Sequence, residues 1–171
     1  ICDCSDLSEI IVIHKDGKYV VTKVSEKAFF GKDILYVGLF DRNDQRTIYN
    51  VIYREGKTSL SYAKRFAVTS VTRDKQYDIT QGTPGSEILW FTVNHNGEAE
   101  TVKIYFRQKS KLKKLIDEYD FSQLLIKGRA SRGNLVSKNQ IQKIQLKSKG
   151  VSTIGGKTAI DFNGYKNIIG A

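Results

Sequence analysis

Two arginines stand between two glycines in the segment Lys127-Gly128-Arg129-Ala130-Ser131-Arg132-Gly133-Asn134. Glycine has no Cβ, so the backbone at Gly128 and Gly133 can come close to a phosphate group. A guanidinium donates paired hydrogen bonds to phosphate oxygens, which suits Arg129 and Arg132 to the same contact. The residue types and their spacing therefore indicate a phosphate-binding loop. The competing interpretation is a turn that carries two solvated arginines.

Positive charge is concentrated in the third of the chain that contains this loop. Residues 101–157 hold 14 of the 28 Lys and Arg residues and three acids, so this third carries a charge of +11. The remainder, with 14 basic and 15 acidic residues, is close to −1. A positive stripe attracts a polyanion and speeds its arrival, so nucleic acid is the first hypothesis. Anionic lipid and an acidic protein are the alternatives.

A membrane fits this charge pattern less well. The basic residues are interleaved with strand-like runs such as 143–147, whereas a membrane-surface helix sets them opposite an apolar face. The sequence has no apolar run of about 18 residues and no signal-peptide pattern. We therefore expect a cytoplasmic protein without membrane association. Because Met is absent even at position 1, we also expect an excised or processed fragment.

The predicted DNA-binding residues are the loop and its basic neighbours. Alternating cations in 107–114 would point one side of a strand at a phosphate backbone, or form a solvated edge that protects a strand from aggregation. No recognition helix or zinc finger is visible, so we expect phosphate contacts without base reading, and an affinity that falls steeply with salt. The set comprises Lys127, Arg129, Arg132, Lys138, Lys143, Lys147, Lys149, Arg107, Lys109, Lys111, Lys113 and Lys114.

Patterns for catalysis are weak. His14 and His95 flank predicted turns and have no convincing nucleophile or acid beside them. Glu98 and Glu100 precede a strand, where we expect a structural surface role. Trp90 is expected in the core and not as a platform for base stacking. The sequence predicts no catalytic residue in this domain.

Patterns for metals and cofactors are equally weak. Cys2 and Cys4 form a single Cys-x-Cys without the second ligand pair of a zinc site. The run 155–157 is too short for a phosphate-binding P-loop. We expect free thiols, no metal and no cofactor in this domain.

Three similar hairpins are predicted upstream of and within the basic third. Each is a strand-like run, a Gly-bearing turn and a second run, at 10–24, 49–62 and 89–104. The turn glycines Gly17, Gly56 and Gly97 are 39 and 41 residues apart. A period near forty in an all-β sequence predicts a propeller-like array of four-stranded blades.

Further strands are expected between and after the hairpins. The candidates are 34–40, 65–72, 135–137 and 140–146, and in 111–122 the repeat favours a strand over a helix. We expect one domain over 1–171, with three blades at 8–46, 47–87 and 88–135 and part of another at 136–171.

The chain resembles the C-terminal domain of bacterial type IIA topoisomerase A subunits. The residues that carry the resemblance are the hairpin 11–18, its copy around Gly56, and the runs 126–136 and 147–156. Together these runs resemble the topoisomerase IV branch more than gyrase. Gyrases carry a Gln-Arg-Arg-Gly-Gly-Lys-Gly box, and the segment 128–133 shares its arginines between glycines but not its sequence.

The resemblance implies a β-pinwheel in which blades exchange strands and double-stranded DNA runs over a basic outer rim. It also implies a cytoplasmic, nucleoid-associated protein. The DNA-cleaving tyrosine, the ATP site and the magnesium-binding acids of the family lie in other domains or in the partner ATPase subunit. The domain would bend or hold DNA and present it for ATP-dependent strand passage.

Two other functions stay open at this point. A protein-interaction propeller explains the repeat but not the +11 third. A binder of single strands or RNA explains the charge but would prefer exposed aromatics among the basic residues. A gyrase-type DNA-wrapping domain is the remaining alternative within the resembling family.

Overall fold

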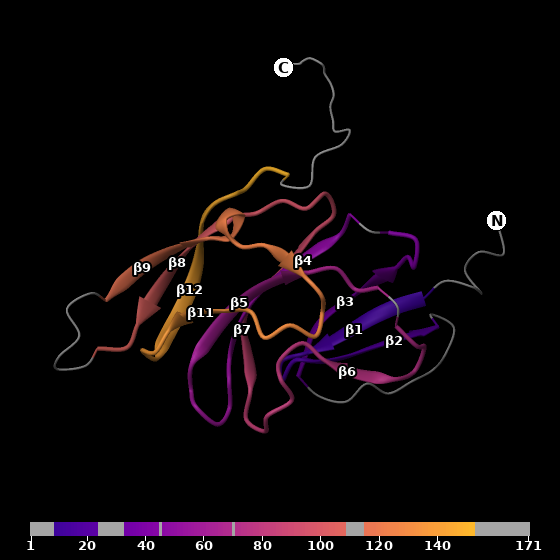
Figure 1. Cartoon of the computed structure of the whole chain (residues 1–171), viewed down its shortest axis with the longest axis horizontal. Helices are drawn as coiled ribbons and strands as arrows, with labels where there is room; N and C mark the ends of the chain where they lie inside the picture. Colours follow the sequence, from indigo (N-terminus) through magenta and orange to yellow (C-terminus); the bar gives the residue numbers. More distant parts are fainter. Residues whose placement is uncertain (1–8, 24–32, 45, 70, 109–114, 153–171) are drawn as a thin grey trace, which may run out of the picture.

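The computed structural model of the chain is built from β-strands (Figure 1). It describes residues 9–23, 33–44, 46–69, 71–108 and 115–152. Within these ranges the one helical element is a single 3₁₀ turn, η1 (Phe121–Gln123). The strands fall into three sheets, which confirms the predicted all-β class.

Sheet 1 contains the first predicted hairpin. Strands β1 (Glu9–His14) and β2 (Lys18–Lys23) pair antiparallel around a turn closed by a 2.9 Å bond from the Gly17 amide to the His14 carbonyl. Gly17 has φ +92°, the conformation that the Asp-Gly pair predicts. Strand β3 (Ile34–Phe40) pairs with β1, and β6 (Gln76–Asp78) pairs with β2.

Sheet 2 contains the second predicted hairpin. Strands β4 (Ile48–Arg54) and β5 (Ser61–Phe66) pair antiparallel. Strand β7 (Glu87–Asn94) covers the other side of β4, while β10 (Ile126–Lys127) and β11 (Asn134–Ser137) both pair with β5. The positive φ in the β4–β5 turn belongs to Ser59, at +62°, and not to Gly56. A Cβ on Gly56 would lie 2.0 Å from the Pro84 carbonyl oxygen, so close packing explains that glycine.

Sheet 3 contains β8 (Thr101–Phe106), β9 (Ile116–Asp120) and β12 (Ile141–Ser148), in the order β12-β8-β9. Its arrangement corrects the third predicted hairpin. A turn is present, since the Gly97 amide donates to the Asn94 carbonyl at 3.1 Å, but β7 and β8 belong to different sheets. The turn is therefore a crossover between sheets.

Two other predicted strands differ in how well their bounds agree with the structure. The strand predicted at 65–72 was wrong in its bounds, because β5 ends at Phe66 and residues 67–69 and 71–72 are in no strand. The ambiguous segment 111–122 does contain a strand, β9, followed by the 3₁₀ turn. Residues 111–114 lie outside the described residues.

The core lies on both faces of sheet 2. Tyr49, Val51 and Tyr53 on β4 pack into a cluster with Ile11 and Val21 of sheet 1. Ile52 and Ala63 belong to a second cluster that contains Val102, Ile104 and Phe121 of sheet 3 and its neighbourhood. Side chains alternate between the two faces of a strand, so β4 and β5 are buried on both. Sheet 2 is thus the middle layer.

Candidate nucleic-acid interface

One stretch of chain, residues 126–152, carries seven of the predicted cations and no acidic residue. It begins with β10 and β11 at the edge of β5 in sheet 2, and continues into β12 at the edge of β8 in sheet 3. The stretch therefore crosses from one sheet to the next along their outer strands. Most of its side chains are exposed.

The predicted phosphate-binding loop, residues 128–133, joins β10 to β11 and closes against the edge of β5. Gly133 has φ +93°, and a Cβ there would lie 2.4 Å from the Ala63 carbonyl oxygen. The fold therefore requires glycine at 133. A Cβ on Gly128 would meet no heavy atom within 4 Å, so packing does not explain that glycine.

Beneath the loop lies a buried cation that the sequence analysis missed. Lys64 on β5 is 1% exposed, and its Nζ donates to the carbonyl oxygens of Arg129 and Ser131, both at 2.7 Å, and of Ile79. Burial lowers the pKa of Lys64 to about 7, while three carbonyl acceptors favour its ammonium form. Lys64 ties the loop of sheet 2 to the residue that follows β6 of sheet 1.

The two loop arginines have different surroundings. The Arg129 guanidinium lies 4.3 Å from the centre of the Tyr77 ring on β6, and its Nε donates to the Thr69 carbonyl at 3.3 Å. Arg132 is exposed, 5.3 Å from the Tyr62 ring, and its carbonyl accepts a 2.7 Å bond from the Tyr53 hydroxyl. Arg129 thus attaches the loop to sheet 1, while Arg132 presents its side chain to solvent.

The other predicted cations are spread along the same stretch. Lys127, Lys138 and Lys149 are exposed, and the Arg107 amide donates to the Gln140 carbonyl at 2.9 Å, which brings the end of β8 to the turn after Lys138. Lys143 lies 4.8 Å from the Tyr105 ring, and Lys147 lies at a register shift further along β12. The remaining candidates, Lys109, Lys111, Lys113 and Lys114, lie outside the described residues.

Acidic residues interrupt the positive surface on β9. Asp117, Glu118 and Asp120 all lie on this five-residue strand, at the far side of sheet 3 from β12. Lys147 reaches across the sheet to Glu118, with a 2.6 Å ion pair. The charge of the basic third is therefore divided, with its acids on β9 and most of its described cations on residues 126–152.

A second buried cation lies on the opposite face of β5. Arg65 is 1% exposed, its Nε donates to Asn50 Oδ1 at 2.9 Å, and its Nη2 donates to the Gly97 carbonyl at 3.0 Å. Burial lowers the pKa of Arg65, and the Glu100 carboxylate opposes this effect. Arg65 thereby holds the crossover turn between β7 and β8.

Glu100 corrects a prediction. It was expected at the surface, but it is 5% exposed. Its carboxylate accepts bonds from Asn50 Nδ2 at 2.6 Å, Trp90 Nε1 at 2.8 Å and Thr92 Oγ1 at 2.7 Å. Its role is structural, as predicted, but internal. The same carboxylate holds Trp90 against the core, which confirms the expectation for that residue.

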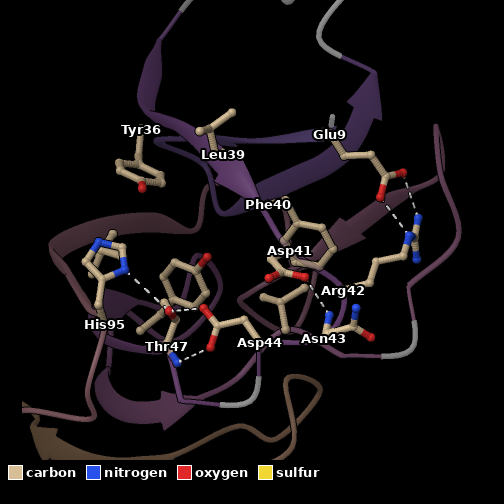
Figure 2. A pocket seen from close by; sticks show the side chains of 13 residues that line it. Glu9, Tyr36, Leu39, Phe40, Asp41, Arg42, Asn43, Asp44, Thr47 and His95 are labelled. Carbon is tan, nitrogen blue, oxygen red and sulfur yellow. Dashed lines mark hydrogen bonds and ion pairs between the residues drawn. The ribbon is translucent and has the colours of Figure 1, made fainter. Parts of the chain in front are cut away.

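A cleft of about 810 Å³ opens between sheets 1 and 2, and Figure 2 shows its lining. Burial raises the pKa of Asp44, but hydrogen bonds from Thr47 and two backbone amides outweigh it, so the pKa is lowered. The Glu9 carboxylate accepts from Arg42 at 2.7 Å and Arg73 at 2.8 Å. Both acids are committed to partners within the protein, an arrangement that stabilises the fold and suits no proton transfer.

Metal ligands and membrane spans are both absent from the described ranges. Among these residues, no three His, Cys, Asp or Glu side chains come together as metal ligands. Cys2, Cys4 and Lys157 lie outside them. The described part of the chain also contains no helix long and apolar enough to cross a bilayer.

The sheets define the class of the domain. Sheets 1 and 2 are each completed by strands from a later part of the chain, and the three sheets form a β-pinwheel-like array. The array carries its acid-free basic stretch on outer strands.

The family follows from comparison with known proteins. The family model of the topoisomerase C-terminal domain of Bacteroidota matches residues 5–149, and the chain belongs to this family. The A subunit of DNA topoisomerase 4 from Borreliella burgdorferi is 23% identical over 138 residues, which cover 80% of this chain and 20% of that protein. The chain thus spans about a fifth of the length of that relative.

Proposed function

We infer that this domain binds duplex DNA as the non-catalytic C-terminal domain of a topoisomerase IV A subunit. The observation that carries the proposal is the acid-free stretch 126–152, with seven cations on an exposed loop and outer strands. Such cations neutralise phosphates and release counterions, which gives affinity without sequence preference. Family membership supports a topoisomerase context.

In the holoenzyme the domain would hold or bend a DNA segment for strand passage. The partners would be the rest of the topoisomerase polypeptide and the ATPase subunit, in a cytoplasmic, nucleoid-associated complex. ATP, Mg²⁺ and the DNA-cleaving tyrosine would belong to those other parts. The reaction supported would be the ATP-dependent relaxation and decatenation of DNA.

The geometry suggests different roles for the loop residues. Arg132, Lys127 and Lys138 are exposed and suit direct phosphate contacts. Arg129, stacked on Tyr77, would orient the loop in addition to any contact of its own. Gly128 leaves its backbone open, which is where a phosphate could approach the loop most closely.

The test is duplex binding by the intact topoisomerase polypeptide across a salt series. Removing one phosphate contact lowers the slope of log affinity against log salt by about 0.9. We expect Arg132→Ala to lower the slope by about one contact, and Arg132→Ala with Arg129→Ala to lower it further. Lys57→Ala, an exposed cation in the β4–β5 turn, is the control with the same charge change.

Three results would contradict the proposal or part of it. An unchanged slope in both Arg variants would move the contact to another face. If Lys57→Ala lowered the slope as much as Arg132→Ala, binding would depend on the net charge of the domain and not on the loop. Absence of duplex binding at low salt would remove the DNA-binding function and favour a protein-interaction domain.

A further inference from the structure

Four successive carbonyls of the loop 128–133, those of residues 129–132, accept hydrogen bonds from side chains of other segments. Lys64 Nζ donates to the first and the third of them, both at 2.7 Å. The second accepts from Gln81 Nε2 at 3.3 Å, and the fourth accepts from the Tyr53 hydroxyl at 2.7 Å. The carbonyl side of the loop is thus turned towards the protein.

The direction of these carbonyls fixes the direction of the amides that follow them. In a planar trans peptide the C=O of one residue and the N–H of the next point in opposite directions, and the described residues contain no cis peptide bond. The Arg129 and Ser131 carbonyls point at Lys64, so the amides of Ala130 and Arg132 point away from it. Lys64 is buried, whereas Ala130 and Arg132 are exposed. The two amides therefore lie on the outer side of the loop.

The two outward amides differ from the amide between them. Within the part of the chain that the structure describes, neither the Ala130 amide nor the Arg132 amide donates a hydrogen bond. The Ser131 amide donates to the Gly128 carbonyl at 3.0 Å, which closes a four-residue turn. The loop thus keeps one amide for its own turn and leaves two donors on its outer side.

The surroundings of these amides suit an anion. Lys127, Arg129 and Arg132 lie in or beside the loop, and residues 126–152 include no acid that would repel a negative charge. A Cβ on Gly128 would meet no heavy atom within 4 Å, so the backbone can be approached closely there. Main-chain amides that face outward from a turn bind anions, and their bonds to an oxyanion are stronger than those between neutral groups.

We propose that the outward amides of Ala130 and Arg132 donate hydrogen bonds to phosphate oxygens, with Lys64 fixing the two peptide planes from beneath. This inference rests on the proposed binding of duplex DNA and adds a second kind of contact to it. Cations neutralise phosphates, whereas main-chain donors hold them in position. An uncharged donor releases no counterion, so these contacts raise the affinity without steepening its dependence on salt.

A pair of variants at one position separates the amide from the cation. Arg132→Ala removes the guanidinium and keeps the amide, while Arg132→Pro removes both and keeps the Ser131 carbonyl as an acceptor for Lys64. Proline requires a negative φ, and the φ of Arg132 is not positive. The two variants have the same net charge, so Arg132→Ala is the matched control for Arg132→Pro.

The measurement is duplex binding by the intact topoisomerase polypeptide across a salt series. We expect Arg132→Pro to bind about tenfold more weakly than Arg132→Ala at every salt concentration, because a hydrogen bond to a charged group contributes about this factor. The salt slopes of the two variants should be equal. Equal affinities would overturn the inference and leave DNA binding intact. Absence of duplex binding by the unaltered protein would instead remove the proposed function.

Residue-resolved amide hydrogen exchange of the unaltered polypeptide gives an answer even if Arg132→Pro does not fold. On saturation with duplex DNA, the amides of Ala130 and Arg132 should exchange at least about tenfold more slowly. The Ser131 amide is the internal control, because its bond to the Gly128 carbonyl exists without DNA. Its exchange should change by less than about twofold.

The same exchange measurement with inorganic phosphate distinguishes two sources of the phosphate group. Protection of the two amides by the duplex would assign the site to the DNA backbone. Protection by inorganic phosphate alone would support the anion site but assign it to a free phosphate ion. Unchanged exchange with both ligands would overturn the proposal.

Discussion

The two faces of β5 carry neighbouring buried cations whose charges are hydrogen-bonded in different ways. Lys64 faces sheet 1 and donates to three backbone carbonyls. Arg65 faces sheet 3 and joins a network of Asn50, Glu100 and backbone carbonyls. Both side chains are 1% exposed. Within the described part of the chain, only Arg65 of the two has an anion close enough to oppose the effect of burial on its pKa.

The difference shows where a strand-exchanged fold needs polar support. A carbonyl in a regular sheet finds its donor in the next strand, but segments that leave one sheet for another lose that donor. Lys64 supplies donors to the basic loop and to Ile79 after β6, and Arg65 supplies them to the crossover turn at Gly97. The two cations therefore replace missing strand neighbours.

The largest loss in the free energy of unfolding is expected when Arg65 is replaced. Arg65→Met removes the donor to Asn50 Oδ1 and the Gly97 carbonyl, and it leaves the buried Glu100 carboxylate, which Arg65 reaches through Asn50, without a neighbouring cation. Removing one of two neighbouring buried charges costs about 3–5 kcal/mol. The measurement is urea denaturation. Arg54→Met on the neighbouring strand is the control, because its 2.7 Å pair with Glu87 is partly exposed and such pairs contribute about 0–1 kcal/mol. Equal losses in the two variants would show that buried Arg65 contributes no more to stability than a partly exposed ion pair.

Replacing Lys64 should lower the free energy of unfolding by less than replacing Arg65, and the loss should depend on pH. Lys64→Met leaves three carbonyls without their donor but no buried anion, so we expect a loss of about 1–3 kcal/mol. The folded-state pKa of Lys64, about 7, is below its ordinary value of 10.5. Between these values the unfolded state binds more protons, so this group makes the free energy of unfolding rise with pH, and below pH 7 its contribution is flat.

Denaturation of the unaltered protein and Lys64→Met between pH 7.5 and about 9.5 checks the sign. The difference between them should grow with pH, by about 1.4 kcal/mol per unit at most. Arg65→Met should show no such slope, because arginine stays charged throughout. A constant difference for Lys64→Met would mean that its ammonium keeps an ordinary pKa.

The two glycines of the loop above Lys64 form a matched pair, and Gly128 gives the smallest expected loss of stability. Gly133→Ala places a Cβ at φ +93° and against the Ala63 carbonyl, for which we expect a loss of about 1–3 kcal/mol. Gly128→Ala meets no neighbour and should cost less than about 0.5 kcal/mol. Thermal unfolding measures both. A larger loss at Gly128 than at Gly133 would contradict the packing of the loop.

Local signals were sufficient for the hairpins and for most strands. The Asp-Gly pair predicts the β1–β2 turn because few other residues adopt its positive φ, and the apolar run 34–40 predicts β3. The turn at Gly97 was found for the same reason. Its flanking strands were paired wrongly, because a turn signal contains no information about which sheet each flanking strand joins.

The candidate loop could be predicted from its arginines and glycines, but the residues that hold it could not. Consecutive cations such as Lys64 and Arg65 normally indicate an exposed strand. Their burial depends on carbonyls from segments up to 67 positions away, as from Ser131 to Lys64. Glu100 was misplaced at the surface because its partners lie on β4 and β7. Non-local pairing of this kind leaves no periodic pattern in one sequence.

The exchange of strands also sets the order in which the domain can form on the ribosome. Lys18 meets Asp78 across a separation of 60 positions, and Arg65 meets Ile126 across a similar one. At about 5–20 residues per second, each early hairpin would wait roughly 3–12 s for the strand that completes its sheet. Until then the outer side of that hairpin exposes unpaired backbone groups. Vectorial synthesis therefore leaves each sheet open to foreign strands until the next repeat has been translated.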